Sequence, residues 1–252
     1  MALLKDTIIL PEEYNKLPDI SNVKDVPKDN LQDLEDLRTL LTKHNVPSTV
    51  SVRLIHKHFD IEDREVMVFK YATVPQYGTL QCMRPVDASS ESKLRGIHYY
   101  VTDTGVLQAY EYTTNRGSDL CGYDSFLGEF CDLVVQRGLQ HKFGLKFKSN
   151  DDLDKMNWTE FEFPSARSTI VIPDGMPMPE GDESFSVNTE WGRENEDIPQ
   201  GNQLRCRHCE HGRCNHSRSP NPKSEDPLYF GGHLVSPNTQ VFGLLNAVVK
   251  VW

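Results

Sequence analysis

The chain has 252 residues, 25% of them charged, and a formal net charge of −10 at pH 7. This length allows one large domain or a domain with an appendage, and the acidic balance argues against a broad nucleic-acid-binding surface. No segment approaches the roughly 18 apolar residues of a membrane helix, and the N-terminus lacks the features of a signal peptide. We therefore expect a cytoplasmic protein without a membrane partner, whose six cysteines are reduced.

The N-terminal part of the chain predicts an arm, a helix and a hairpin. Residues 1–29 combine proline with charge and show little periodicity, so we expect an arm laid over the surface. Residues 30–44 predict a helix, because leucines recur at steps of three and four and acidic residues precede basic ones. Two alternating segments follow, residues 50–59 and 65–74, and they predict a pair of strands.

The remainder of the chain predicts mostly strands. Further strands are expected at residues 79–83, 96–102, 106–113, 139–147, 158–163, 168–172 and 185–191. Apolar residues at helical spacing predict a helix that begins at Asp124 or Ser125 and stops at Gly138, and another over residues 240–252.

This order of elements predicts an α+β fold, because crossover helices do not alternate with the strands. We expect a single domain with a largely antiparallel sheet, two or three helices and a C-terminal loop stapled by zinc. Its parts are then a surface arm (1–29), an α+β core (30–203), a Cys/His loop (204–223) and a C-terminal segment that packs back on the core (224–252).

The strongest chemical signal is the segment Leu204–Ser217, which reads LRCRHCEHGRCNHS. Thiolate and imidazole are the ligands that zinc prefers, and a Cys-x-x-Cys pair can reach one ion from a tight turn. We expect one Zn²⁺ ion on Cys206, Cys209, Cys214 and His216, with His211 as the alternative fourth ligand. A shell closed in this way is structural. The alternative is a loop without metal that is sensitive to oxidation.

The same segment is basic within an acidic protein. Its arginines are Arg205, Arg207, Arg213 and Arg218. They could neutralise the zinc–thiolate cluster, which is the simpler interpretation, or contact the phosphates of an RNA.

Two pairs of polar residues on predicted strands are candidates for catalysis. His56 and His58 alternate on one strand face, where two imidazoles could chelate a metal, although one hydrogen-bonded core histidine and one histidine at the strand end are the simpler interpretation. Glu160 and Glu162 alternate on another strand and could act as acid and base or hold a guanidinium group, although a solvated strand face is the simpler interpretation. Gly-rich phosphate loops, G-x-S-x-G and H-E-x-x-H are absent.

Four segments, SVRLIHKHFD, LQAYEYT, RGLQHKFGL and WTEFEFP, precede the Cys/His-rich tail. With that tail they resemble uncharacterised fungal proteins to which the arginine-containing cyclodipeptide synthases belong. The resemblance spans roughly residues 48–216, without a motif matched residue by residue. It implies an enzyme that takes an arginyl group from its tRNA and joins it to a second amino acid. We therefore expect a zinc-binding enzyme that acts on a small molecule or on aminoacyl-tRNA; the alternative is a non-catalytic, zinc-stabilised module that binds protein or RNA.

Overall fold

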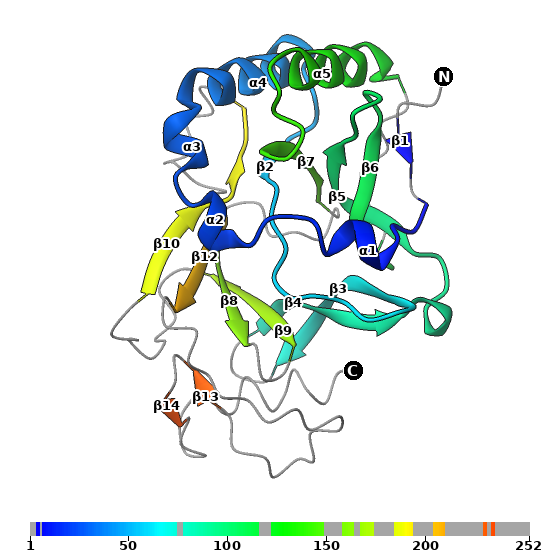
Figure 1. The fold of residues 1–252 in the computed structure, drawn as a ribbon, viewed down its shortest axis with the longest axis vertical. Helices are drawn as coiled ribbons and strands as arrows, with labels where there is room; N and C mark the ends of the chain where they lie inside the picture. Colours follow the sequence, from blue (N-terminus) through cyan, green and yellow to red (C-terminus); the bar gives the residue numbers. More distant parts are fainter. Residues whose placement is uncertain are drawn as a thin grey trace.

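A computed structural model describes ten parts of the chain (Figure 1). They are residues 4–5, 7–74, 78–115, 122–148, 158–163, 167–173, 184–193, 204–209, 229–230 and 233–234. The helices are α1 (Pro11–Tyr14), α2 (Ile20–Val23), α3 (Val26–Asp29), α4 (Leu31–Lys43) and α5 (Asp124–Gln136), with a 3-10 turn η1 at Ala88–Ser90. The strands are β1 (Leu4–Lys5), β2 (Val50–Leu54), β3 (Glu65–Val74), β4 (Gly78–Asp87), β5 (Arg95–Val101), β6 (Leu107–Thr113), β7 (Phe143–Phe147), β8 (Trp158–Phe163), β9 (Ser168–Pro173), β10 (Ser184–Asn188), β11 (Glu190–Trp191), β12 (Leu204–Cys209), β13 (Tyr229–Phe230) and β14 (His233–Leu234).

The predicted α+β class is confirmed, and its main feature is one large mixed sheet. The strand order among the described residues is β10-β12-β8-β9-β4-β3-β6-β5-β7-β2-β11, with β1 added beside β6. Three pairs are parallel, β1 with β6, β3 with β6 and β12 with β8, and the other pairs in this sheet are antiparallel. Strands β13 and β14 form a separate hairpin.

The large sheet curls into a barrel-like shape. Strands β10 and β11 stand at opposite ends of the strand order, yet only Thr189 separates them along the chain. The Thr189 carbonyl accepts a hydrogen bond from Leu54 N at 2.9 Å, at the end of β2. One residue therefore links the two ends of the sheet, and side chains on its concave face are brought together across the interior.

Helices α4 and α5 lie side by side against the sheet (Figure 1). Each buries an apolar stripe, which is why the helical spacing in the sequence located both of them. Ion pairs join the two helices on their exposed sides, Lys43 Nζ to Glu129 Oε2 at 2.6 Å and Arg137 Nη1 to Asp33 Oδ1 at 2.6 Å. The two helices cover apolar residues of the sheet, including the apolar residues that alternate along β2.

The N-terminal residues form three short helices where the sequence predicted an irregular arm. The described residues among 1–29 contribute five buried side chains to the main core, Ile9, Tyr14, Leu17, Ile20 and Val23. The chain between α1 and α2 also pairs with the segment that follows β2, where Asp19 and Lys57 form an isolated bridge. The N-terminal part thus packs against the residues that carry His56 and His58. The predicted helix over residues 240–252 lies outside the described residues.

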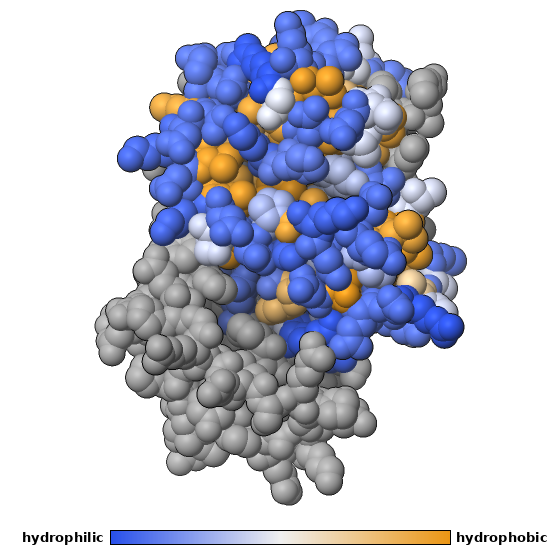
Figure 2. All heavy atoms as spheres, viewed as in Figure 1, coloured by the Kyte–Doolittle hydropathy of each residue, from blue (hydrophilic) through white to orange (hydrophobic). Residues whose placement is uncertain are grey.

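Polar residues occur both outside and inside this fold. Figure 2 shows that the face seen in Figure 1 is mainly hydrophilic, with small separate apolar areas. The interior is nevertheless polar as well, because alternate residues of several strands carry charge and are buried. The buried charged or titratable residues include Arg53, His56, His58, His98, Glu111, Lys146, Lys148, Glu160, Glu162 and Glu190. Ionisable groups are rarely buried in such numbers unless they are paired or functional.

Candidate functional site

The candidate site is a group of seven buried polar residues, which we call the interior cluster. They come from β2, the segment after β2, β5, β6 and β8: Arg53, His56, His58, His98, Glu111, Glu160 and Glu162. The ion pair between Arg53 Nη2 and Glu160 Oε2, at 3.7 Å, crosses from β2 to β8 and so spans the interior. The curl of the sheet is what brings these residues together.

His56 and His58 lie just after β2, not on it. The strand ends at Leu54. In the segment that follows, Ile55 N donates a hydrogen bond to Lys142 O and Lys57 N donates one to Pro18 O, both at 2.9 Å, and these two bonds anchor the main chain. Both imidazoles are buried, at 0% and 8% exposure, and their ring centroids are 4.9 Å apart. The two rings lie close together as predicted, but the loop after β2 positions them and not a strand face.

Glu160 and Glu162 share one face of β8, and that face is buried. The interpretation of a solvated strand face is wrong, because the two residues are 1% and 8% exposed. The barrel-like curl turns this face toward the interior, where it meets His58. Glu162 Oε1 lies 2.8 Å from His58 Nδ1, and Glu160 Oε1 lies 3.3 Å from His58 Nε2 and accepts a 2.9 Å hydrogen bond from Thr169 Oγ1.

The two histidines differ in charge because of their neighbours. Burial by itself would lower the pKa of His58, but the adjacent Glu160 and Glu162 carboxylates raise this pKa to about 9. In the metal-free protein His58 is therefore an imidazolium held between two carboxylates. Burial lowers the pKa of His56 well below its usual range, and the positive charge of Arg53 lowers it further. His56 is therefore neutral, with Nδ1 bonded at 2.9 Å to Leu54 O.

A second pair, His98 and Glu111, lies at a bulge in the β5–β6 hairpin. The register of the two strands shifts on both sides of His98, and such bulges redirect side chains near functional sites. His98 Nδ1 and Glu111 Oε2 make a short hydrogen bond, and both residues are buried. The other polar atoms of the pair, His98 Nε2 and Glu111 Oε1, are buried without a hydrogen-bond partner among the described residues. A polar ligand or ordered water would satisfy such atoms.

The protonation of this pair is set by burial and by nearby cations. Burial raises the pKa of Glu111 to about 7, although His58 and Arg53 act in the opposite direction. Burial lowers the pKa of His98 well below its usual range, and Arg53 and Lys146 lower it further. Near neutral pH the pair thus combines a neutral imidazole with a carboxyl group that is close to its midpoint. This arrangement can both accept and donate a proton.

The other three residues of the interior cluster were harder to identify from the sequence. Arg53, His98 and Glu111 were not among the predicted site residues. His98 and Glu111 stand opposite each other on the strands predicted at residues 96–102 and 106–113, among aromatic and apolar neighbours, so pairing the two strands would have drawn attention to them. Arg53 had no such signal, because its burial depends on strands more than 100 residues later in the chain.

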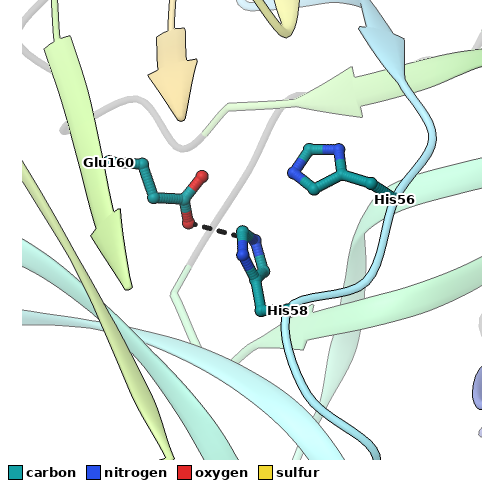
Figure 3. A group of neighbouring side chains, drawn as sticks. All are labelled: His56, His58 and Glu160. Atoms are coloured by element: carbon teal, nitrogen blue, oxygen red, sulfur yellow. Dashed lines mark ion pairs between the residues drawn. The ribbon is translucent and has the colours of Figure 1, made fainter. Parts of the chain in front are cut away.

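Three members of the interior cluster could hold a metal ion. One donor atom from each of His56, His58 and Glu160 lies within 4.8 Å of the other two, and all three residues are buried. Figure 3 shows the ring of His56 and the carboxylate of Glu160 directed toward each other, with His58 beside them. This metal-ligating group was not predicted as a set, since Glu160 was paired in the sequence only with Glu162.

The predicted zinc ligands fall only in part within the described residues. Cys206 and Cys209 belong to β12, which pairs with β8 and β10, and they do not lie in the tight turn that was expected. Arg205 and Arg207 belong to the same strand. The remaining ligands and arginines proposed for this segment lie outside the described residues: His211, Arg213, Cys214, His216 and Arg218.

The comparisons with known proteins add no analogy to this geometry. None of the described helices is long and apolar enough to cross a membrane. Searches with this chain match no model of a protein family, no characterised protein and no solved structure.

Proposed function

We propose that this protein is an enzyme that transforms a small polar molecule inside the barrel, with the His98–Glu111 pair moving a proton. The observation that carries the proposal is the buried pair itself, whose His98 Nε2 and Glu111 Oε1 have no hydrogen-bond partner within the described part of the chain. A carboxyl group with a pKa of about 7 that is hydrogen-bonded to a neutral imidazole is suited to general acid–base catalysis.

The interior cluster favours a charged or strongly polar substrate. Cationic and anionic side chains lie within a few ångströms of each other, as in the ion pairs of Glu160 with Arg53 and His58. An apolar substrate would leave His98 Nε2 and Glu111 Oε1 unsatisfied, which costs about 1–3 kcal/mol per group. A substrate that carries both an amine and a carbonyl group could exchange hydrogen bonds with both types of side chain.

The most specific reaction we propose is the synthesis of an arginine-containing cyclodipeptide from aminoacyl-tRNA. The resemblance of the four sequence segments supports it, as do buried carboxylates that could hold a guanidinium group. The first amide bond forms when the α-amine of one aminoacyl group attacks the ester carbonyl of an aminoacyl-tRNA, and the second forms when the free α-amine of the resulting dipeptidyl-tRNA attacks its own ester carbonyl. An ester C–O bond breaks in each step. The His98–Glu111 pair would take the proton from the amine and return it to the tRNA hydroxyl that leaves.

We separately propose that one zinc ion stabilises the Cys/His segment. Cys206, Cys209, Cys214 and His216, or His211 in its place, would hold one ion that orders the segment after β12. The chemistry of the donor set supports this role. Elemental analysis of protein prepared without a metal-affinity tag should find zinc, and replacing the three cysteines with serine should lower the zinc content by one ion per chain. Zinc content unaffected by that replacement would contradict the proposal.

Mass spectrometry of cells that express the protein tests the proposed reaction. We expect an arginine-containing cyclodipeptide in cells with the wild-type chain and none in cells with an empty vector. Replacing Glu111 with Gln or His98 with Asn should abolish the product, because proton transfer is lost. The matched control is His141→Ala, which changes an exposed histidine and should leave the product unchanged.

The outcomes separate the two classes of function. Product in wild-type cells but not in the two pair variants, each with a native circular dichroism spectrum, supports the enzyme and the role of the pair. Metabolites indistinguishable from the vector control would contradict the cyclodipeptide reaction. Such a result together with specific binding of RNA or of a protein would favour the non-catalytic module.

A further inference from the structure

We propose that His56, His58 and Glu160 form a binding site for a divalent first-row transition metal, in the two-histidine, one-carboxylate arrangement of non-haem iron(II) centres. The three donor atoms lie within 4.8 Å of one another in a buried place, and the side chains converge from the segment after β2 and from β8 (Figure 3). This inference does not depend on the cyclodipeptide reaction, because it concerns binding alone.

The orientation of the two imidazoles is the first argument. Metal-ligating histidines usually bond to the ion through one ring nitrogen and donate from the other to a carbonyl or carboxylate oxygen. Both rings have such an oxygen at Nδ1: Leu54 O lies 2.9 Å from His56 Nδ1, and Glu162 Oε1 lies 2.8 Å from His58 Nδ1. Each ring is thereby oriented so that Nε2 is the nitrogen it would present to an ion.

The spacing of the donor atoms is the second argument. Nitrogen and oxygen ligands lie about 2.0–2.2 Å from such ions, so two ligands of one ion are about 3–4 Å apart. His58 Nε2 and Glu160 Oε1 are already 3.3 Å apart. Because all three donors lie within 4.8 Å, small side-chain rotations would complete the set.

The rigidity of the support is the third argument. Ile55 N and Lys57 N, on either side of His56, donate 2.9 Å hydrogen bonds to Lys142 O and Pro18 O. On the opposite side, Thr169 Oγ1 donates to Glu160 Oε1 at 2.9 Å. Both halves of the site are thus fixed to the framework before an ion arrives, which lowers the cost of assembling it.

Charge around the site also suits a cation. Glu160 would bind the ion directly, and Glu162 would add a second negative charge through its hydrogen bond to His58. His58 would then be a neutral ligand, and these two carboxylates would offset the charges of the ion and of Arg53, which lies 3.7 Å from Glu160 Oε2. Three protein ligands leave positions for water or substrate, as in catalytic metal sites.

Cobalt(II) binding to the full-length chain tests this site. The protein should carry Cys206→Ser, Cys209→Ser and Cys214→Ser, so that the thiols of the Cys/His segment cannot bind the probe. We expect this chain to bind one Co²⁺ with visible d–d absorption but no thiolate charge-transfer band. Loss of a residue that only hydrogen-bonds to a metal ligand typically weakens binding by about 10–100-fold. His56→Ala and Glu160→Gln remove ligands and should weaken Co²⁺ binding by more than this.

Two further variants sharpen the test. Glu162→Gln keeps the three ligands and should weaken binding by about 10–100-fold, whereas His141→Ala, at an exposed histidine, should have no effect. Because ligand variants could fail to fold, pulsed electron paramagnetic resonance of Mn²⁺ in the chain with the three cysteine-to-serine replacements gives a second readout. Nitrogen couplings from two imidazoles would support the site. A chain that binds no Co²⁺, affinity unchanged in folded His56→Ala, or Mn²⁺ without imidazole coupling would overturn it.

Discussion

Glu190 illustrates how single residues of this protein carry buried charge. Its carboxylate lies 3.0 Å from Lys146 Nζ and 2.8 Å from Lys148 Nζ, and it accepts a 2.9 Å hydrogen bond from Ser51 Oγ. Burial opposes the ionisation of Glu190, but the two lysines hold its pKa well below the usual range. The four residues therefore act as one unit that links β2, β7 and β11.

Glu190→Gln should destabilise the protein by about 3–5 kcal/mol, because two buried lysines lose their counter-charge. The pKa of Glu190 is lower in the folded than in the unfolded chain. Its contribution to stability is therefore present above about pH 4.3, the unfolded value, and is lost as the pH falls toward the folded value. Urea unfolding from about pH 6 to about pH 3.5 should show a flatter acid dependence for the variant.

The control for this measurement is Glu12→Gln, which removes an exposed carboxylate in α1. Its unfolding free energy and its pH dependence should match those of the wild-type chain. A Glu190→Gln variant as stable as the wild type at about pH 6 would show that the lysines do not depend on this carboxylate.

Four of the seven residues of the candidate site could be predicted from the sequence as two separate pairs, but the cluster as a group could not. Alternation identified His56 with His58 and Glu160 with Glu162, because local spacing determines which neighbours share a face. It could not determine that the glutamate pair is buried, since this depends on the distant contact of β8 with the segment after β2. The same limit applies to Arg53, whose neighbour Glu160 is supplied by another strand.

At the scale of elements, the pairing of β5 with β7 depends on the close approach of the two backbones. A Cβ atom on Gly144 would lie 1.9 Å from Tyr99 O and 3.0 Å from Tyr99 C. Both of these are backbone atoms of the neighbouring strand, so a side-chain rotation cannot relieve the contact. The same pair of strands carries His98 opposite Lys146, and any displacement would therefore reach the interior cluster.

Gly144→Ala should consequently separate β5 from β7 and lower the unfolding free energy by at least about 1–3 kcal/mol, the range for overpacking. Thermal unfolding followed by circular dichroism measures the loss. The matched control is Gly192→Ala, because a Cβ atom there would meet nothing within 4 Å. Equal melting temperatures for the two variants would mean that the strands adjust without cost.

Elements with a long periodic pattern were predictable, and elements defined by tertiary contact were not. Helices α4 and α5 and strands β5 and β6 are where the spacing of apolar residues indicated. Strand β7 begins at Phe143 and not at Leu139, because Leu139 N still bonds to Val134 O at the end of α5. The helices of residues 11–29 have four residues each, too few for a periodic signal. The available cue was proline near the helix start: Pro11 is the first residue of α1 and Pro27 the second residue of α3.

At the scale of the whole molecule, the order of the strands determines where the chemistry lies. Twelve strands could form an open sheet, and nothing in the alternation of residues distinguishes an open sheet from a curled one. The closure comes from Thr189, which connects β10 to β11 across the ends of the strand order. Because closure encloses the polar face, the candidate site is a property of the complete barrel-like sheet.

Closure predicts that the two ends of the sheet unfold together with the helices. Trp191 in β11 is 8% exposed and contacts Phe143 at a ring-centroid distance of 6.1 Å, so its fluorescence reports on the closing strand. In a Trp158→Phe, Trp252→Phe background only this tryptophan remains. Strand β11 pairs with β2 and is joined to β10 through Thr189, while β10 pairs with β12, so β11 should not fray on its own and urea should unfold Trp191 and the helices in one transition with the same midpoint. Helix loss is followed by circular dichroism on the same samples. A Trp191 transition at clearly lower urea would show instead that β11 opens on its own, as the edge of an open sheet would.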